Sequence, residues 1–135
     1  MFVGTEWLIE AEGCKAEILA NNETIERILE DVIHDLGLKP LNRFWHSFIS
    51  PPGITGLIAL TESHLACHTY PELGIATFNL FCCRERPDWP WEQELKKRLL
   101  ASEVKISKIQ RGESAGKSAA FAESSQNQFT GGIGE

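Results

Sequence analysis

The chain has 135 residues, a formal net charge of −6 at pH 7 and a hydrophobic content of 42%. This length fits one domain with a single core and excludes a two-domain enzyme. The acidic balance argues against a nucleic-acid-binding groove, which needs a basic face. The sequence has no run of ~20 apolar residues that could span a membrane, and its first residues lack the basic start of a signal peptide. We therefore expect a cytoplasmic globular protein that acts on a small molecule, with no nucleic-acid or membrane partner.

The four cysteines include no C-x-x-C pair. Disulfides are rare in the reducing cytosol, so the cysteines are expected to be free thiols. Cys82 and Cys83 are adjacent, which is a poor geometry for joint zinc ligation. Cys67 could share a metal with His64 and His68, but this spacing matches no common zinc pattern. We expect no metal.

The chain begins with a predicted strand, Thr5–Ala11, followed by a short helical turn at Lys15–Leu19. Asn21 or Asn22 can cap the helix that comes next, and Gly37 can end it. Its apolar residues recur at helical spacing and form one stripe: Ile25, Ile28, Leu29, Val32, Ile33 and Leu36.

Short apolar runs bounded by Gly, Pro or charge predict five more strands: Leu41–Ile49, Gly56–Thr61, Leu65–Thr69, Ile75–Phe81 and Val104–Ile109. Turns are expected at residues 50–53 and 71–74, where prolines interrupt the strands. A second helix is expected from Trp91 to Leu100, with a solvated basic face at residues 96–98. Helices segregated onto an antiparallel sheet predict an α+β fold, a two-layer sandwich with the helices on one face.

Residues 112–135 are rich in Gly, Ser, Ala and Gln and carry few large apolar side chains. Such a segment buries too little surface to offset its ordering entropy, so we expect a disordered low-complexity tail. The predicted folded domain is residues 1–111.

The densest polar cluster is residues 61–72, TESHLACHTYPE, between two apolar strands. Buried polar groups need partners, which makes this segment a candidate site. Ser63 and His68 could suggest a serine hydrolase, but no G-x-S-x-G elbow surrounds the serine. A lone histidine is more often a satisfied polar group than a catalyst.

Residues 56–72, GLIALTESHLACHTYPE, resemble the processing site of the bacterial S-adenosylmethionine decarboxylases. The resemblance continues through Gly74-Ile75-Ala76 and residues 79–83 and covers about residues 4–111, with no counterpart for the tail. It implies a lyase that cleaves itself and feeds decarboxylated S-adenosylmethionine to polyamine synthesis, such as spermidine synthesis.

In such a proenzyme, Ser63 would attack the carbonyl of Glu62, and His68 matches the histidine that serves processing. Thr55 takes the place of a serine whose hydroxyl assists. The products would be a β chain, residues 1–62, and an α chain, residues 63–135, that begins with a covalent pyruvoyl group made from Ser63. No metal and no pyridoxal phosphate are implied. We expect the turn at Glu62–Ser63 to be strained or closely hydrogen-bonded.

The resemblance also implies substrate contacts. The pyruvoyl ketone forms a Schiff base with the substrate amine. Cys83 matches the proton donor to the substrate, which His68 nearby could tune, and Cys82 should face the other way. Phe48 matches one adenine-stacking ring, Tyr70 replaces a tryptophan as the second, and Glu72 matches the glutamate that binds ribose.

Three readings stay open. The first, which the resemblance favours, is decarboxylation of S-adenosylmethionine. The second is the same pyruvoyl chemistry on arginine or ornithine, which the changes at Thr55, Tyr70 and Arg84 keep open. The third is a non-enzymatic subunit that is never processed and activates a partner. The resemblance implies a homodimer of processed protomers, in which both chains complete each site.

Overall fold

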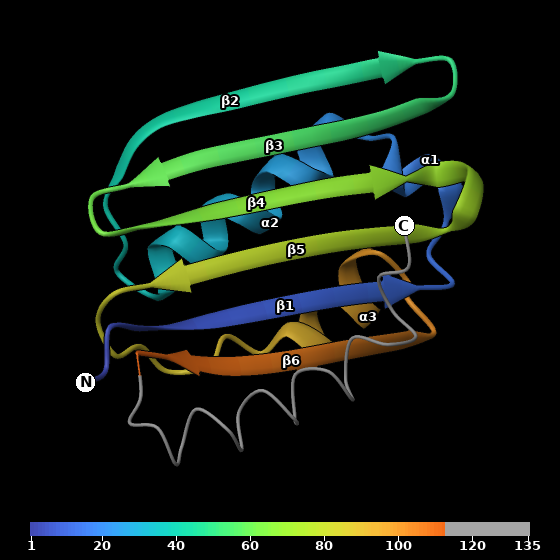
Figure 1. Cartoon of the computed structure of the whole chain (residues 1–135). Coiled ribbons are helices and arrows are strands. Elements are labelled where there is room, and N and C mark those ends of the chain that lie inside the picture. The colour runs from blue at the N-terminus through green and yellow to red at the C-terminus, as the bar shows by residue number, and fades with distance from the viewer. Residues whose placement is uncertain (113–135) are drawn as a thin grey trace.

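The computed structural model describes residues 1–112 as one sheet with helices on one side, which confirms the predicted two-layer α+β sandwich (Figure 1). The predicted tail lies outside the described residues except for Gly112. The sheet is formed by β1 (Gly4–Glu12), β2 (Pro40–Ile49), β3 (Pro52–Leu60), β4 (Ser63–Tyr70), β5 (Ile75–Cys82) and β6 (Glu103–Arg111). The helices are α1 (Ala16–Leu19), α2 (Asn22–Asp35) and α3 (Trp91–Arg98). None of the helices in residues 1–112 is long and apolar enough to cross a membrane.

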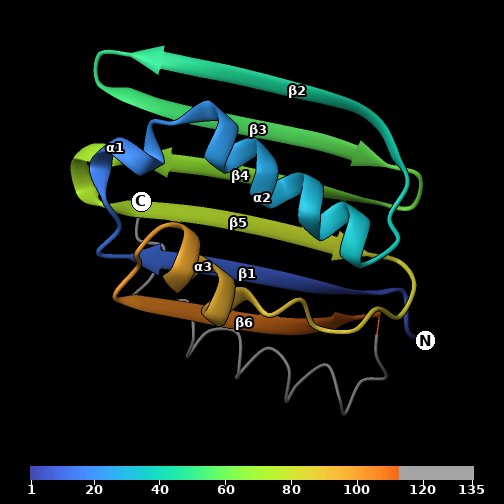
Figure 2. The ribbon, with the colours of Figure 1, turned by 180° about the vertical axis from the view of Figure 1, so that it is seen from behind.

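The strand order is β2-β3-β4-β5-β1-β6, and all neighbouring strands are antiparallel. Strands β2 to β5 follow one another along the chain, whereas β1 enters between β5 and β6. Seen from behind, α2 lies across the middle strands and α3 lies over β1 and β6 (Figure 2). No helix within residues 1–112 covers the opposite face of the sheet, and we call it the open face.

Helix α2 forms where the sequence predicts it. The side chain of Asn21 accepts a hydrogen bond from the Thr24 N–H at 2.9 Å and caps the helix. Gly37 follows the helix with a φ of +65°, a conformation that glycine adopts without strain. The predicted apolar stripe packs against the sheet, and all six of its side chains are buried.

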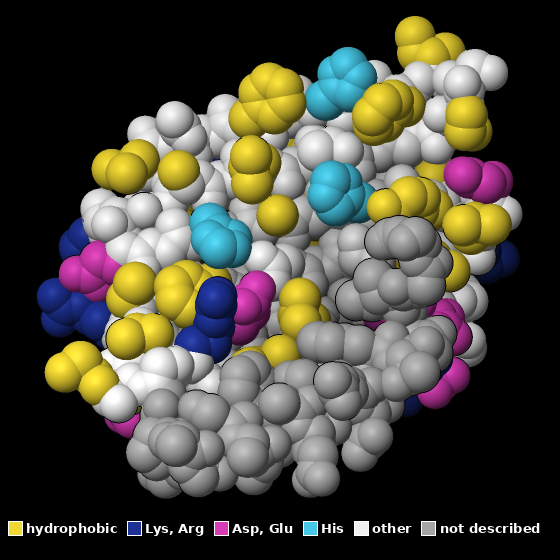
Figure 3. Space-filling view, in the orientation of Figure 1, with side chains coloured by type: hydrophobic (Ala, Val, Ile, Leu, Met, Phe, Trp, Pro, Cys, Tyr) yellow, Lys and Arg dark blue, Asp and Glu magenta, His cyan; other side chains and the backbone are white. Residues whose placement is uncertain are grey.

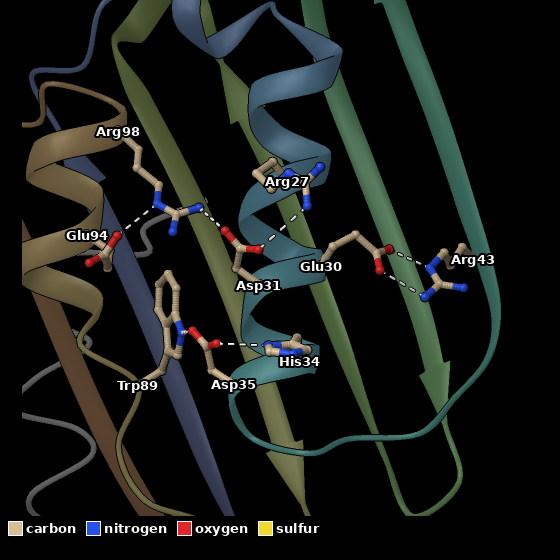
Figure 4. Close-up of polar contacts among 9 residues, drawn as sticks. All are labelled: Arg27, Glu30, Asp31, His34, Asp35, Arg43, Trp89, Glu94 and Arg98. Atoms are coloured by element: carbon tan, nitrogen blue, oxygen red, sulfur yellow. Dashed lines mark hydrogen bonds and ion pairs between the residues drawn. The ribbon is translucent and has the colours of Figure 1, made fainter.

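An ion pair also connects α2 with α3 (Figure 4). Arg98 Nη1 on α3 lies 2.7 Å from Asp31 Oδ2 on α2, and its Nε lies 2.9 Å from Glu94 Oε1. The prediction of a solvated basic face is therefore wrong for Arg98, whose side chain contacts the acidic side of α2. The prediction agrees with Lys96, whose side chain is 44% exposed. Arg43 on β2 pairs with Glu30, so α2 is held to both of its neighbours.

The strands extend beyond their predicted bounds, most of all at the start of β3. Pro52 and Gly53, predicted as turn residues, begin β3, and Pro52 lies opposite Ile49 in the ladder. A proline at the first position of a strand need not donate a ladder hydrogen bond, which explains why it is tolerated there. Residues 71–73 form a short 3₁₀ turn that joins β4 to β5, as the prolines suggest.

One buried hydroxyl gives a test of the packing between β3, β4 and α1. The Thr69 hydroxyl accepts from the Ile54 N–H at 3.0 Å and donates to the Leu19 carbonyl at 2.8 Å. Thr69→Val should lower the free energy of unfolding by about 1–3 kcal/mol, because two buried backbone groups lose their partner. Urea unfolding measures this. Thr69→Ser keeps the hydroxyl and should lose less, so equal losses in the two variants would contradict the prediction.

Candidate functional site

The polar segment at residues 61–72 consists of a turn, the whole of β4 and the start of the 3₁₀ turn that follows it (Figure 1). Alternation along the strand sends its side chains to two different faces. Cys67 and Thr69 are buried toward the helices, whereas His68 and Tyr70 are exposed on the open face. The metal site that Cys67 could form with His64 and His68 is therefore excluded, because the cysteine lies on the face opposite to the two histidines.

The peptide between Glu62 and Ser63 lies in the β3–β4 turn and is held by hydrogen bonds. The Glu62 carbonyl accepts from the Cys83 N–H at 3.3 Å. The Glu62 side chain accepts a hydrogen bond from Arg84 Nε, which lowers the pKa of this carboxyl. Backbone strain is absent here, since Leu100 is the one non-glycine residue within 1–112 that has a positive φ. The expected turn is thus closely hydrogen-bonded rather than strained.

The two adjacent cysteines lie beside this peptide in different environments. Ser63 is directly opposite Cys82 in the β4–β5 ladder, and its hydroxyl hydrogen-bonds to the Cys82 thiol. Burial raises the pKa of Cys82, whose residue is 2% exposed. Cys83, one residue beyond the strand, is exposed. The sequence interpretation set Cys82 aside, although a hairpin register that pairs the start of β4 with the end of β5 would have placed it next to Ser63.

A cavity of about 370 Å³ opens at this end of the sheet. Ser63, Glu62 and both cysteines line it, together with basic residues from two other segments. Lys39 comes from the loop after α2, and Arg84 and Arg86 follow β5. None of these three was expected as a site residue from the sequence, because their charges come together only when the α2–β2 loop reaches the end of β5. We call this the cleavage end of the sheet.

The opposite end of the sheet collects the other predicted residues. Thr55 on β3 and His68 on β4 are ladder partners, and Thr55 Oγ1 lies 3.1 Å from His68 Nδ1. His46 on β2 is paired with Thr55 in the next ladder, so it shares this row of the open face. The ring of His46 packs edge-on against Phe48 with centroids 4.5 Å apart. His46 is a residue that sequence reasoning missed, although its alternation with Phe48 on a strand signals it.

Two aromatic side chains frame a gap beside this pair. Phe48 lies opposite Gly53, and extending the β3–β4 register by two residues places Gly53 opposite Tyr70. The backbone positions of Phe48 and Tyr70 are therefore two strand spacings, about 10 Å, apart, and the glycine between them has no side chain. Glu72 is exposed in the 3₁₀ turn directly after Tyr70. We call this group, with Thr55 and His68, the histidine end of the sheet.

Within one chain, the two ends are well separated. Five residues of extended β4 separate Ser63 from His68, a distance of about 16 Å. The odd separation also turns the two side chains to different faces. The expected proximity of His68 to Cys83 is therefore not found within a single protomer.

The open face is apolar over β2, β3 and β4, where hydrophobic and histidine side chains gather (Figure 3). Its large exposed side chains are Phe44 at 59%, Phe48 at 52%, Leu57 at 51% and Tyr70 at 39%. Contiguous apolar surface of this kind marks an interaction site in soluble proteins.

Comparison with known proteins places these features in a family. The family model described as S-adenosylmethionine decarboxylase matches residues 5–112. The chain is 37% identical over 112 residues to the S-adenosylmethionine decarboxylase proenzyme of Caldicellulosiruptor saccharolyticus, a match covering 82% of this chain and 89% of that one. A proenzyme of the same name from Acetivibrio thermocellus is also 37% identical, with the same coverage.

A solved structure agrees at the level of the fold. The crystal structure of the adenosylmethionine decarboxylase from Aquifex aeolicus superposes with a TM-score of 0.69 at 24% identity, covering 84% of this chain and 93% of that chain. The sheet order and helix placement described above are thus those of a known decarboxylase fold. With the family model covering all but a few of the described residues, the chain belongs to the S-adenosylmethionine decarboxylase family.

Proposed function

We propose that this chain is a proenzyme that cleaves itself between Glu62 and Ser63 and then decarboxylates S-adenosylmethionine. Membership of the family supports the reaction. The observation that carries the proposal is the state of the Glu62–Ser63 peptide, whose carbonyl is held by the Cys83 N–H beside the Ser63 hydroxyl. A carbonyl oxygen that already accepts a hydrogen bond is prepared to carry negative charge when a nucleophile attacks it.

The residues at the cleavage end fit the formation of a pyruvoyl group. Ser63 Oγ attacks the Glu62 carbonyl carbon, and the peptide bond becomes an ester. Removal of the Cα proton of residue 63 then releases the Glu62 carboxylate and leaves a dehydroalanine. Its imine form takes up water and loses the residue 63 nitrogen as ammonia, which leaves the pyruvoyl group in the 370 Å³ cavity. The pyruvoyl group supplies a carbonyl that accepts the electron pair left when CO₂ departs.

The base that removes the Cα proton is His68 in this proposal. Its Nδ1 lies 3.1 Å from Thr55 Oγ1. When Nδ1 carries the proton and donates to this hydroxyl, Nε2 is unprotonated and can accept one. Since His68 and Ser63 of one chain are about 16 Å apart, the histidine must come from a second copy.

A two-fold dimer can bring the two ends together along the strand direction. An axis that lies between two open faces and runs across the strands places the cleavage end of one sheet over the histidine end of the other. The apolar side chains of the open face would be buried in this contact. Each dimer then contains two equivalent sites, each formed by both chains.

The histidine end suits the substrate. A flat ring between two aromatic rings needs about 7 Å. The backbone positions of Phe48 and Tyr70, about 10 Å apart, allow this once the Phe48 ring turns away from Gly53, which it contacts in the free chain. Glu72 can accept hydrogen bonds from the two ribose hydroxyls. Cys83, exposed at the cleavage end, is the proposed proton donor to the substrate carbon, and Cys82 is held by Ser63 in the precursor.

Intact-mass measurement and CO₂ release test this function together. We expect the purified protein to consist of two chains that end and begin at residues 62 and 63, and to release CO₂ from S-adenosylmethionine. Arginine and ornithine are the matched alternatives, because Glu72 could also pair with a guanidinium or ammonium group. A single chain of 15.1 kDa that releases no CO₂ would support the non-enzymatic reading. Cleavage with release from arginine or ornithine alone would overturn the substrate but not the chemistry.

A further inference from the structure

The cavity at the cleavage end carries an excess of positive charge. Its lining includes three basic residues, Lys39, Arg84 and Arg86, and one carboxylate, that of Glu62. The whole chain has a net charge of −6, yet basic side chains outnumber acidic ones around the Glu62–Ser63 peptide. Such a cavity favours the binding of an anion, and the contacts of the three basic side chains show where it would bind.

Among the described residues, two of these cations form no ion pair with a carboxylate. Arg84 is engaged, since its Nε donates to Glu62 Oε1. Arg86 Nε is buried and makes no hydrogen bond to any residue within 1–112, although a buried guanidinium nitrogen without a partner is costly. Lys39 forms no ion pair with the described residues, and its backbone carbonyl is held by the Thr61 N–H at 3.0 Å beside the turn.

Self-cleavage, as proposed above, produces an anion at this place. When the Cα proton of residue 63 is removed, the Cβ–Oγ bond of the ester breaks and its electron pair goes to the Glu62 carboxylate. The cavity then holds two carboxylates of Glu62, the side chain and the new chain end. Arg84 neutralises only the first of them.

We propose that Arg86, assisted by Lys39, forms a carboxylate site that receives the main-chain carboxylate of Glu62 as it leaves Ser63. The inference rests on the proposed self-cleavage. A guanidinium can bind both oxygens of a carboxylate, and it stabilises the leaving group most when that group carries its full charge. Interactions that strengthen along the reaction are the ones that raise its rate.

The substrate carboxylate is a poorer occupant of this site. That group is lost as neutral CO₂, so a cation held against it would stabilise the reactant more than the transition state and would slow the reaction. The Glu62 carboxylate gains charge instead, and the same cation then speeds the step. Arg84 is already paired with the Glu62 side chain, whereas Arg86 Nε has no hydrogen-bond partner within residues 1–112. This difference fits a site for one more carboxylate, which forms only when the ester breaks.

The test follows the processing of Arg86→Gln by intact mass after treatment with hydroxylamine, which cuts esters but not peptides. We expect chain separation to slow by roughly tenfold or more. An uncut species of 15.1 kDa should accumulate, and hydroxylamine should convert it into an α chain that begins with serine. Arg86→Lys keeps the charge and should restore much of the rate. Arg27→Gln removes an arginine that pairs with Asp31 on the far side of α2 and should process normally.

The outcomes separate the inference from the function on which it rests. Processing of Arg86→Gln at the wild-type rate would overturn the carboxylate site, as would arrest as a hydroxylamine-resistant peptide, which would place Arg86 before the ester. If the wild-type chain itself stays uncut and resistant, the self-cleavage proposal fails. Thermal unfolding of the variants shows whether a slow variant is simply unfolded, and Arg86→Lys then decides.

Discussion

Ser63→Ala should abolish both cleavage and decarboxylation. Without Oγ the Glu62 carbonyl has no nucleophile, and without the ester no pyruvoyl group forms. We expect a single chain of 15.1 kDa and CO₂ release at the background level. The fold should persist, because Ser63 is only partly buried and the β4–β5 ladder depends on its backbone. Intact mass and unfolding measure the two effects.

A matched control is available on β2. The Ser47 hydroxyl lies 3.1 Å from Asn22 Oδ1, on the α2 side of the sheet and not on the open face that carries His46 and Phe48. Ser47→Ala makes the same chemical change and should be cleaved and active. If Ser63→Ala were still cut after residue 62, or still released CO₂ above background, the proposed origin of the cofactor would be wrong.

A His68→Ala chain should be cleaved only when its partner in the dimer carries an intact His68. Alone, this variant should be cleaved roughly 10²-fold more slowly or worse, because the Cα proton loses its base. Co-expressed with Ser63→Ala, its cleavage should return. The mixed dimer contains one site in which an intact Ser63 faces an intact His68 of the partner, and a second site that lacks both.

Different affinity tags on the two variants isolate the mixed dimer and identify the cut chain by mass. We expect the His68→Ala chain to be cut and the Ser63→Ala chain to stay whole. The double variant Ser63→Ala/His68→Ala is the control, since it offers no histidine and should restore nothing. A His68→Ala chain that stays uncut beside Ser63→Ala would contradict the shared site, and with it the dimer proposed across the open face.

The helices and strands were predictable from local pattern. The stripe from Ile25 to Leu36 has helical spacing and is buried, and the six predicted strands are present within a few residues of their expected bounds. Errors fall where long-range pairing overrides local signals. Pro52 is drawn into β3 by its partner Ile49, and Arg98 is drawn from solvent by Asp31. Neither partner can be known before α2 and β2 are placed.

The candidate site divides in the same way. The Glu62–Ser63 peptide, the adjacent cysteines and the Phe48, Tyr70 and Glu72 set were named from sequence, and their roles stay predictions. The pairing of Thr55 with His68 agrees with one shared task for these residues. Lys39, Arg84 and Arg86 were missed as site residues because charge alone says nothing of position.

By itself, the sequence determined the family, the element types and the peptide at which cleavage is proposed, since each depends on residue identity and short-range spacing. The tertiary structure alone decided that Ser63 and His68 lie at opposite ends of the sheet and on opposite faces. The physical reason is that a β-strand separates residues by about 3.3 Å each and alternates their direction, while only the helix positions determine which face is covered. The short sequence distance between the two residues therefore concealed a spatial separation that a second copy of the chain can close.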